Sequence, residues 1–138
     1  MTRSHEPLIR LARFKVEELQ KQLADIDRVR TSLNDQIERL EASVPEEQAA
    51  ATDNKDGYIA YGSYAQAVIK RKQNIRASLD EVDQQAEGIR ERLEAAFREL
   101  KKYELLEERR VARIEDALRA EEQAELDEIA QTRRRNAH

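Results

Sequence analysis

Residues that commonly do chemistry are few in this sequence, and their spacing argues against a catalytic site. The two histidines, His5 and His138, have no neighbouring set of metal ligands. The absence of cysteine excludes disulfides, thiol catalysis and thiolate metal sites. The sequence also contains no Glu-x-x-His motif, Gly-rich phosphate loop or HExxH motif, and carboxylate pairs such as Glu107/Glu108 are expected on solvated helix faces. We therefore expect a protein that is not an enzyme and that needs no metal or cofactor.

Three tyrosines at a spacing of three, Tyr58, Tyr61 and Tyr64, are the most distinctive side chains, and Val68 follows one helical turn later. On a helix, the three tyrosines could line one face, which Val68 would continue. They would then either close the apolar seam between two helices or form a partner surface, because tyrosine is common at protein interfaces. The two interpretations are compatible if the tyrosine edges remain exposed.

The sequence contains two short basic clusters that are candidates for binding an acidic partner. Lys70-Arg71-Lys72 points in several directions around a predicted helix, which favours solvation. Arg133-Arg134-Arg135 follows a predicted last helical turn, where cations interact favourably with the helix dipole, and it could also bind an acidic partner.

The composition favours long helices that pair along a seam. Ala, Glu, Arg, Leu and Lys supply 77 of the 138 residues, whereas there are 3 Gly, 2 Pro and no Trp. This length predicts at most one domain. The net charge of −4 comes from mixed signs, so nothing resembles a nucleic-acid footprint, and no apolar run is long enough to span a membrane. The predicted fold is all-α, and the simplest location is the cytoplasm.

A first helix is predicted over residues 8–44, where a heptad pattern runs as far as Val44-Pro45. Arg30 falls at one seam position, and Val29 beside it is expected to cover part of the gap. The other seam positions of this helix are apolar: Ile9, Ala12, Val16, Leu19, Leu23, Ile26, Leu33, Ile37, Leu40 and Val44.

The second helix is predicted over residues 63–133, after a turn region at 45–62 in which Thr52 to Gly57 has turn chemistry. Ser63 and Gln66 fit a capping box at its start. Its seam positions alternate spacings of four and three: Ile75, Leu79, Val82, Ala86, Ile89, Leu93, Ala96, Leu100 and Tyr103.

The two helices are expected to form an antiparallel coiled-coil hairpin whose second helix is longer. If Val44 faces Ser63, Ile9 lies near Arg98, Phe14 lies near Leu93, and residues beyond about 103 have no partner from the first helix. This segment, 104–132, still carries an apolar stripe that is shifted by a four-residue stutter. Exposed apolar surface of this kind usually marks an interaction site, so a second copy or another protein should pack on it. The stripe comprises Leu105, Leu106, Val111, Ile114, Leu118, Leu126 and Ile129.

Over residues 8–135 the pattern resembles the FliJ family of the bacterial flagellar type III export apparatus. Three stretches carry the resemblance. Residues 59–68, IAYGSYAQAV, are similar to the aromatic entry to the family's second helix. Residues 100–110, LKKYELLEERR, and residues 125–133, ELDEIAQTR, resemble its later charged and terminal signatures.

The resemblance implies a non-catalytic central stalk in the pore of the hexameric export ATPase, with contacts to the export gate protein FlhA and to export chaperones. Under this resemblance, Tyr61, Tyr64 and Val68 match the aromatic and apolar positions of the family that are linked to contact with the gate protein. The resemblance also matches Leu126, Ile129 and Arg133 to the end near the ATPase. The implied location is cytoplasmic and peripheral to the inner membrane, with a role in flagellum biogenesis, motility and chemotaxis. The alternatives are the equivalent stalk of a virulence secretion system, a homodimeric coiled-coil adaptor and, third, a nucleic-acid-binding hairpin.

Overall fold

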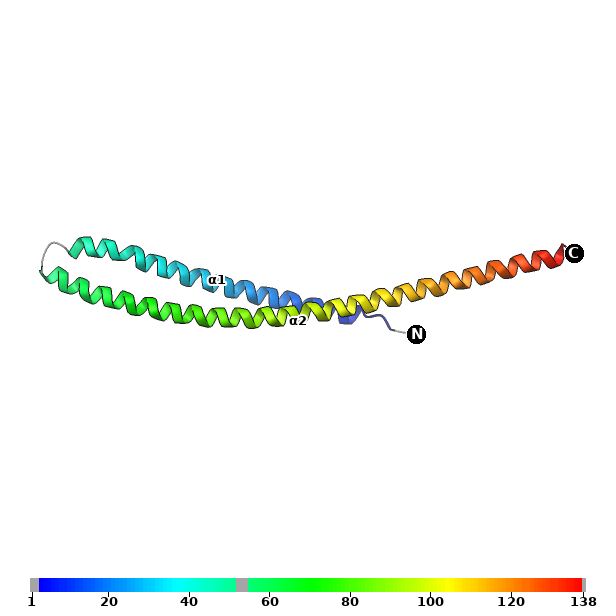
Figure 1. Cartoon of the computed structure of the whole chain (residues 1–138), viewed down its shortest axis with the longest axis horizontal. Coiled ribbons are helices and arrows are strands. Elements are labelled where there is room, and N and C mark those ends of the chain that lie inside the picture. The colour runs from blue at the N-terminus through cyan, green and yellow to red at the C-terminus, as the bar shows by residue number, and fades with distance from the viewer. Residues whose placement is uncertain (1–2, 52–54, 138) are drawn as a thin grey trace. The chain divides into compact units, whose positions relative to one another are not determined.

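The computed structural model describes residues 3–51 and 55–137, which form two α-helices (Figure 1). Helix α1 spans Glu6–Ala51 (46 residues), and helix α2 spans Lys55–Asn136 (82 residues). The described residues contain no strand. This confirms the predicted antiparallel two-helix hairpin with a longer second helix. Within these ranges, neither helix has an apolar stretch of the length that crossing a membrane requires.

The chain divides into two compact units. One consists of Glu17–Glu94 and is a hairpin formed by most of α1 and the first half of α2. The other combines the residues up to Val16 with those from Ala95 onward, so the first turns of α1 lie against the middle of α2.

The predicted seam is the core of each unit. In Glu17–Glu94 the buried residues of α2 recur at spacings of three, four and seven, and the seam leucines and isoleucines of α1 are half-buried opposite them. The terminal unit continues the same pattern with four buried residues, one of them on α2. The buried residues of the unit Glu17–Glu94 are Ala51, Val68, Ile75, Val82, Ala86 and Ile89. Those of the terminal unit are Ile9, Ala12, Val16 and Ala96. The heptad prediction is confirmed.

The predicted inner ends of the two helices are wrong, whereas the predicted outer ends, at about residues 8 and 133, lie within three residues of Glu6 and Asn136. Helix α1 continues through Pro45 to Ala51, and α2 begins at Lys55 instead of Ser63. Proline removes one helical N–H, yet α1 still packs beyond it, since Ala51 is buried. Tertiary packing thus outweighs the local signals. Of the predicted turn over 52–57, residues 52–54 lie outside the described residues, whereas Gly57 is helical.

The predicted alignment of the two helices is also wrong. It placed Arg30 opposite Ala77, whereas Arg30 Nη2 lies 2.7 Å from Asp83 Oδ1. Lys72 Nζ likewise lies 3.2 Å from Glu41 Oε1, whereas the predicted alignment placed Lys72 opposite Asp35, six residues earlier. The physical reason is that seam residues of the two helices must meet in common layers, and the predicted alignment does not superimpose the two heptad patterns.

The terminal unit follows the same alignment. Leu11 and Ala12 border one crevice together with Glu99 and Tyr103, so the predicted neighbourhood of Ile9 with Arg98 is wrong. Placing Ile9 opposite Tyr103 brings the seam positions of α1 from Ile9 to Ile37 opposite seam positions of α2 from Tyr103 to Ile75.

Arg30 occupies its seam position as a half-buried cation with two carboxylate partners. Its Nε donates to Asp83 Oδ1 at 2.8 Å, and its Nη1 donates to Asp27 Oδ1 at 2.9 Å. Val29, expected to cover the gap, is instead exposed. The charge is therefore tolerated through ion pairing and not through apolar cover.

Candidate functional site

The tyrosines at the end of the hairpin contribute to its packing. Tyr61 and Tyr64 are half-buried. The hydroxyl of Tyr64 is hydrogen-bonded to the hydroxyl of Ser43, which in turn donates to the carbonyl of Leu40 at 2.7 Å. Tyr61 borders a hollow of about 190 Å³ between the end of α1 and the start of α2. Both rings thus have a structural role and retain partly exposed edges.

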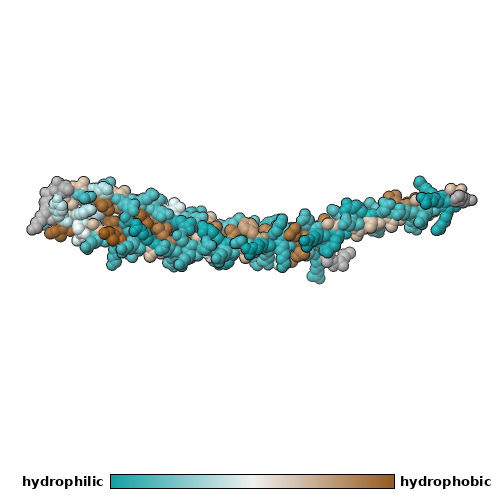
Figure 2. Space-filling view, viewed as in Figure 1, coloured by the Kyte–Doolittle hydropathy of each residue, from teal (hydrophilic) through white to brown (hydrophobic). Residues whose placement is uncertain are grey.

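Val68, expected on the same partner surface, lies in the seam with 5% of its surface exposed. A partner could reach it only by opening the hairpin. The exposed apolar side chains near this end are Tyr58, Ile59 and Ile69, and Figure 2 shows brown surface close to the end where the helices are joined. Periodicity alone could have indicated the burial of Val68, because it lies seven residues before Ile75.

The first basic cluster is divided by the fold. Lys72 is half-buried and pairs with Glu41, whereas Lys70 and Arg71 are exposed. This agrees with the interpretation that the cluster is spread over several faces of one helix.

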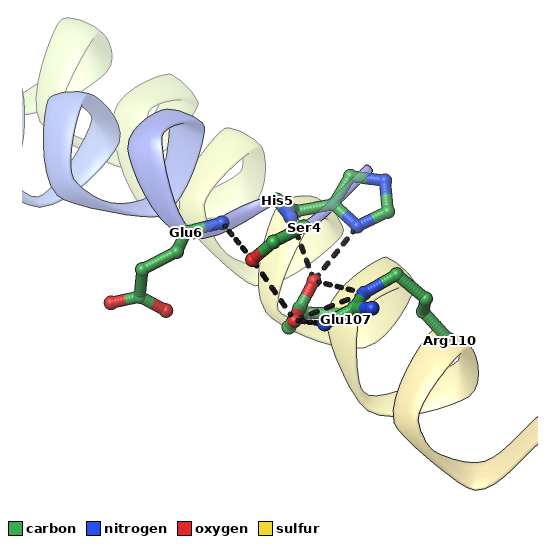
Figure 3. A network of polar contacts seen from close by, with 5 residues as sticks. All are labelled: Ser4, His5, Glu6, Glu107 and Arg110. Atoms are coloured by element: carbon green, nitrogen blue, oxygen red, sulfur yellow. Dashed lines mark hydrogen bonds and ion pairs between the residues drawn. The ribbon is translucent and has the colours of Figure 1, made fainter. Parts of the chain in front are cut away.

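A polar cluster at Glu107 joins the start of α1 to α2 (Figure 3). The backbone N–H of His5 donates to Glu107 Oε2 at 2.7 Å, and His5 Nδ1 lies 3.0 Å from the same oxygen. Ser4 Oγ donates to Glu107 Oε1 at 3.3 Å and accepts the N–H of Glu6 at 3.2 Å. Arg110 Nη2 donates to Glu107 Oε1 at 2.6 Å. We call these residues the Glu107 clamp.

The clamp supplies partners for amide groups that the start of a helix leaves unpaired. Hydrogen bonds from Arg110, and then the one from the His5 backbone, hold the pKa of Glu107 well below its usual range. The same contact with Glu107 raises the pKa of Arg110. The contact with the amino-terminal segment therefore reaches Glu107, through Ser4 and His5, which precede α1. The prediction that residues beyond about 103 have no partner from the first helix did not anticipate this contact. The sequence signal was available, since Glu107 and Arg110 continue the seam spacing.

Acidification is expected to release the start of α1. The pKa of Glu107 is lower in the folded state than its ordinary value of 4.5, so the clamp stabilises fully above about pH 4.5 and weakens as the pH falls below it. The His5 amide resonance in NMR spectra should move with this loss. Glu107→Gln should show the released position already at neutral pH.

Glu108→Gln is the matched control, because Glu108 is the exposed neighbour of Glu107 and has no place in the clamp. It should keep the wild-type titration of the His5 amide. An unchanged His5 resonance in Glu107→Gln would contradict this account of the clamp.

Beyond the clamp, α2 continues to Asn136, and every residue from Val111 to Ala137 is exposed. Within the described residues, this segment packs against no other part of the chain. We call residues 111–137 the arm. Its large apolar side chains are 40% to 60% exposed, and Figure 2 shows apolar surface among hydrophilic side chains on the later part of α2. The predicted residues Val111, Ile114, Leu118, Leu126 and Ile129 all lie on it.

Arg133 lies near the end of the arm. It lines a shallow groove of about 380 Å³ with Glu125, Glu128, Ile129 and Thr132. The groove brings an apolar side chain, two carboxylates and a guanidinium together on one helix. Such a surface can dock another protein but has no enclosed space for a substrate.

A model of the family described as "Flagellar FliJ protein" matches residues 3–138. Two proteins with that same name, from strains NA1000/CB15N and ATCC 19089 of Caulobacter vibrioides, are each 31% identical to the chain over 131 residues. The match covers 94% of this chain and 94% of each relative. No solved structure matches.

Proposed function

The chain belongs to the FliJ family of flagellar proteins, and we propose that it acts as the central stalk of the flagellar export ATPase ring. The arm is the observation that supports this most directly. A helix with large exposed apolar residues and no intrachain partner in the described residues is suited to enter a ring and pack against its inner wall. The Glu107 clamp would hold the start of α1 against the base of the arm.

The role is mechanical and not catalytic. Asymmetric contacts of one stalk with the ring would bias the conformations of the ATPase subunits, because a ligand shifts an equilibrium only through its different affinity for the two states. The flagellar names of both relatives favour this proposal over the equivalent stalk of a virulence secretion system.

The end of the hairpin is proposed to contact the export gate protein FlhA and export chaperones through the exposed edges of Tyr61 and Tyr64. These edges, with the exposed Tyr58, Ile59 and Ile69, support a second docking surface remote in sequence from the arm. The protein would then work in the cytoplasm, peripheral to the inner membrane, and contribute to motility.

A titration with the purified hexameric export ATPase of the same organism tests the proposal. Phosphate release should rise and saturate at about one full-length chain per ring, because a stalk occupies a single pore. An unrelated two-helix coiled coil of similar length should leave the rate unchanged. A requirement for one chain per ATPase subunit, or no rise in rate, would contradict the stalk role.

A further inference from the structure

A groove of about 220 Å³ lies between α1 and α2 in the unit Glu17–Glu94. Helix α2 supplies one lining residue, Arg71. Helix α1 supplies the other four from two successive turns: Gln36, Arg39, Leu40 and Ser43. We call this site the arginine groove, because it brings the guanidinium groups of both helices to one place, together with an amide and a hydroxyl.

The two cations of the arginine groove have no anionic partner. Arg39 and Arg71 are exposed, and neither forms an ion pair with any residue that the structure describes. Asp35 lies one helical turn from Arg39 on α1, yet these two side chains are not paired either. Lys72 shows the contrast, because it is half-buried and pairs with Glu41. Two cations that border one groove repel each other, so an anion between them would lower the electrostatic energy.

The start of α2 offers Arg71 no carboxylate of its own. Residues 57–79 contain four basic side chains and no acidic one, although 29 of the 138 residues of the chain are acidic. No acidic residue of α2 therefore lies within two helical turns of Arg71, and the usual pairing at a spacing of three or four residues is not open to it.

We propose that the arginine groove binds a carboxylate side chain from an acidic segment of another protein. A guanidinium group presents paired N–H donors that match the two oxygens of a carboxylate, and clusters of arginine are a common means of recognising acidic segments. Ser43 links the groove to the hairpin end, since its hydroxyl is hydrogen-bonded to that of Tyr64. The proposal deepens the contact of the hairpin end with FlhA or export chaperones, and it rests on that part of the proposed function.

An extended polyanion suits this surface less well. The unit Glu17–Glu94 contains 17 acidic and 11 basic residues, so its net charge is −6. Nucleic acids and anionic membranes are held by many cations spread along a surface, and this unit would repel them on most sides. One acidic side chain, or a short acidic cluster, needs only the local positive charge of the groove.

Two double substitutions test the proposal in the full-length chain. The groove variant is Arg39→Gln with Arg71→Gln. The control variant is Arg13→Gln with Arg92→Gln, which also removes one exposed guanidinium from each helix but leaves the groove intact. Urea unfolding followed by circular dichroism verifies that both variants keep the wild-type stability. Binding of the labelled chains to purified FlhA and to a purified export chaperone of the same organism is followed by fluorescence anisotropy.

The groove variant should bind at least one of these proteins about tenfold more weakly than wild type, and the control variant should remain within about threefold of wild type. Equal binding by wild type and groove variant would overturn the proposal. Equal losses in the two variants would also overturn it, since net charge and not the groove would then decide binding.

Arg71→Lys identifies the chemistry of the bound group while keeping the positive charge. The new amine can be coupled by a carbodiimide to a carboxylate that lies against it. Mass spectrometry of the complex should find position 71 joined to an aspartate or glutamate of the partner protein. Arg92→Lys is the control and should give no such product at position 92. Absence of a product at position 71, or products at both positions, would contradict the proposal.

The ATPase assay separates failure of this proposal from failure of the stalk role. No residue of the arginine groove belongs to the arm, so the groove variant should stimulate the export ATPase as wild type does. Groove-dependent binding without stimulation would refute the stalk and support the groove. Stimulation together with binding that ignores the groove would support the stalk and refute the groove. If the wild type bound neither FlhA nor the chaperone, the contact of the hairpin end would fail, and the groove proposal with it.

Two further outcomes would identify a different occupant. Groove-dependent cosedimentation with vesicles of phosphatidylethanolamine and phosphatidylglycerol would indicate an anionic lipid. A wild-type dimer that the groove variant dissociates in sedimentation experiments would indicate an acidic segment of a second copy. Either result would overturn the proposal.

Discussion

Replacing Ile75 with alanine is expected to destabilise the hairpin by about 2–4 kcal/mol, the cost of removing a buried aliphatic side chain from a packed seam. Ile75 is 6% exposed in α2 and belongs to the heptad seam of the unit Glu17–Glu94. A two-helix seam has few layers, so the loss of one layer is a large fraction of the total stability. Urea unfolding followed by circular dichroism at 222 nm measures the change.

Ile69→Ala provides the matched control. It makes the same chemical change six residues earlier on the same helix, at a side chain that is 57% exposed. Its effect should remain within about 0.5 kcal/mol. If the two variants unfolded at the same urea concentration, the burial pattern of the seam would be wrong.

Replacing Ile114 and Leu118 together with serine is expected to reduce stimulation of the export ATPase by about tenfold or more. Both side chains are about half exposed on the arm, and the proposed docking would bury them against the ring. Burying a large aliphatic side chain contributes about 1.5–3 kcal/mol, so the loss of two such contacts would greatly weaken the complex. The stimulated rate of phosphate release is the measurement.

The same double variant should leave the unfolding of the hairpin unchanged within about 0.5 kcal/mol, because neither side chain contributes to a seam in the described residues. Val29→Ser is the control for activity, since Val29 is a similarly exposed aliphatic residue on α1. Full stimulation by the arm variant, or equal loss in Val29→Ser, would show that the stripe is not the docking surface.

The arm also distinguishes a stalk from a homodimeric adaptor. An adaptor would cover the stripe with a second arm in the absence of any other protein. Light scattering of the full-length chain at increasing concentration shows whether it does.

Several features of this protein were determined by the sequence alone. The heptad positions of both helices, from Ile9 to Leu40 and from Ile75 to Tyr103, identified the seam. The exposed stripe on the arm was also predictable. These features depend on helical periodicity, which is a local property of consecutive residues and needs no knowledge of the partner helix.

The tertiary structure decided where the helices end and how they align. Pro45 and the turn residues near Gly57 are local signals for a break, yet packing of α1 on α2 extends both helices past them. The alignment depends on which layers of two distant segments meet. Arg30 accordingly pairs with Asp83, far from the predicted neighbour.

The Glu107 clamp and the burial of Val68 followed from that alignment. Glu107 is one of 29 acidic residues, and the sequence does not distinguish it from the others. It gains a defined structural role only because His5 lies against it in the folded chain. Val68 likewise follows three tyrosines in the sequence, and only the packing of α1 against α2 buries it. Sequence periodicity thus specifies which face of each helix is apolar, whereas contacts between residues about a hundred positions apart depend on the long-range register of the two helices.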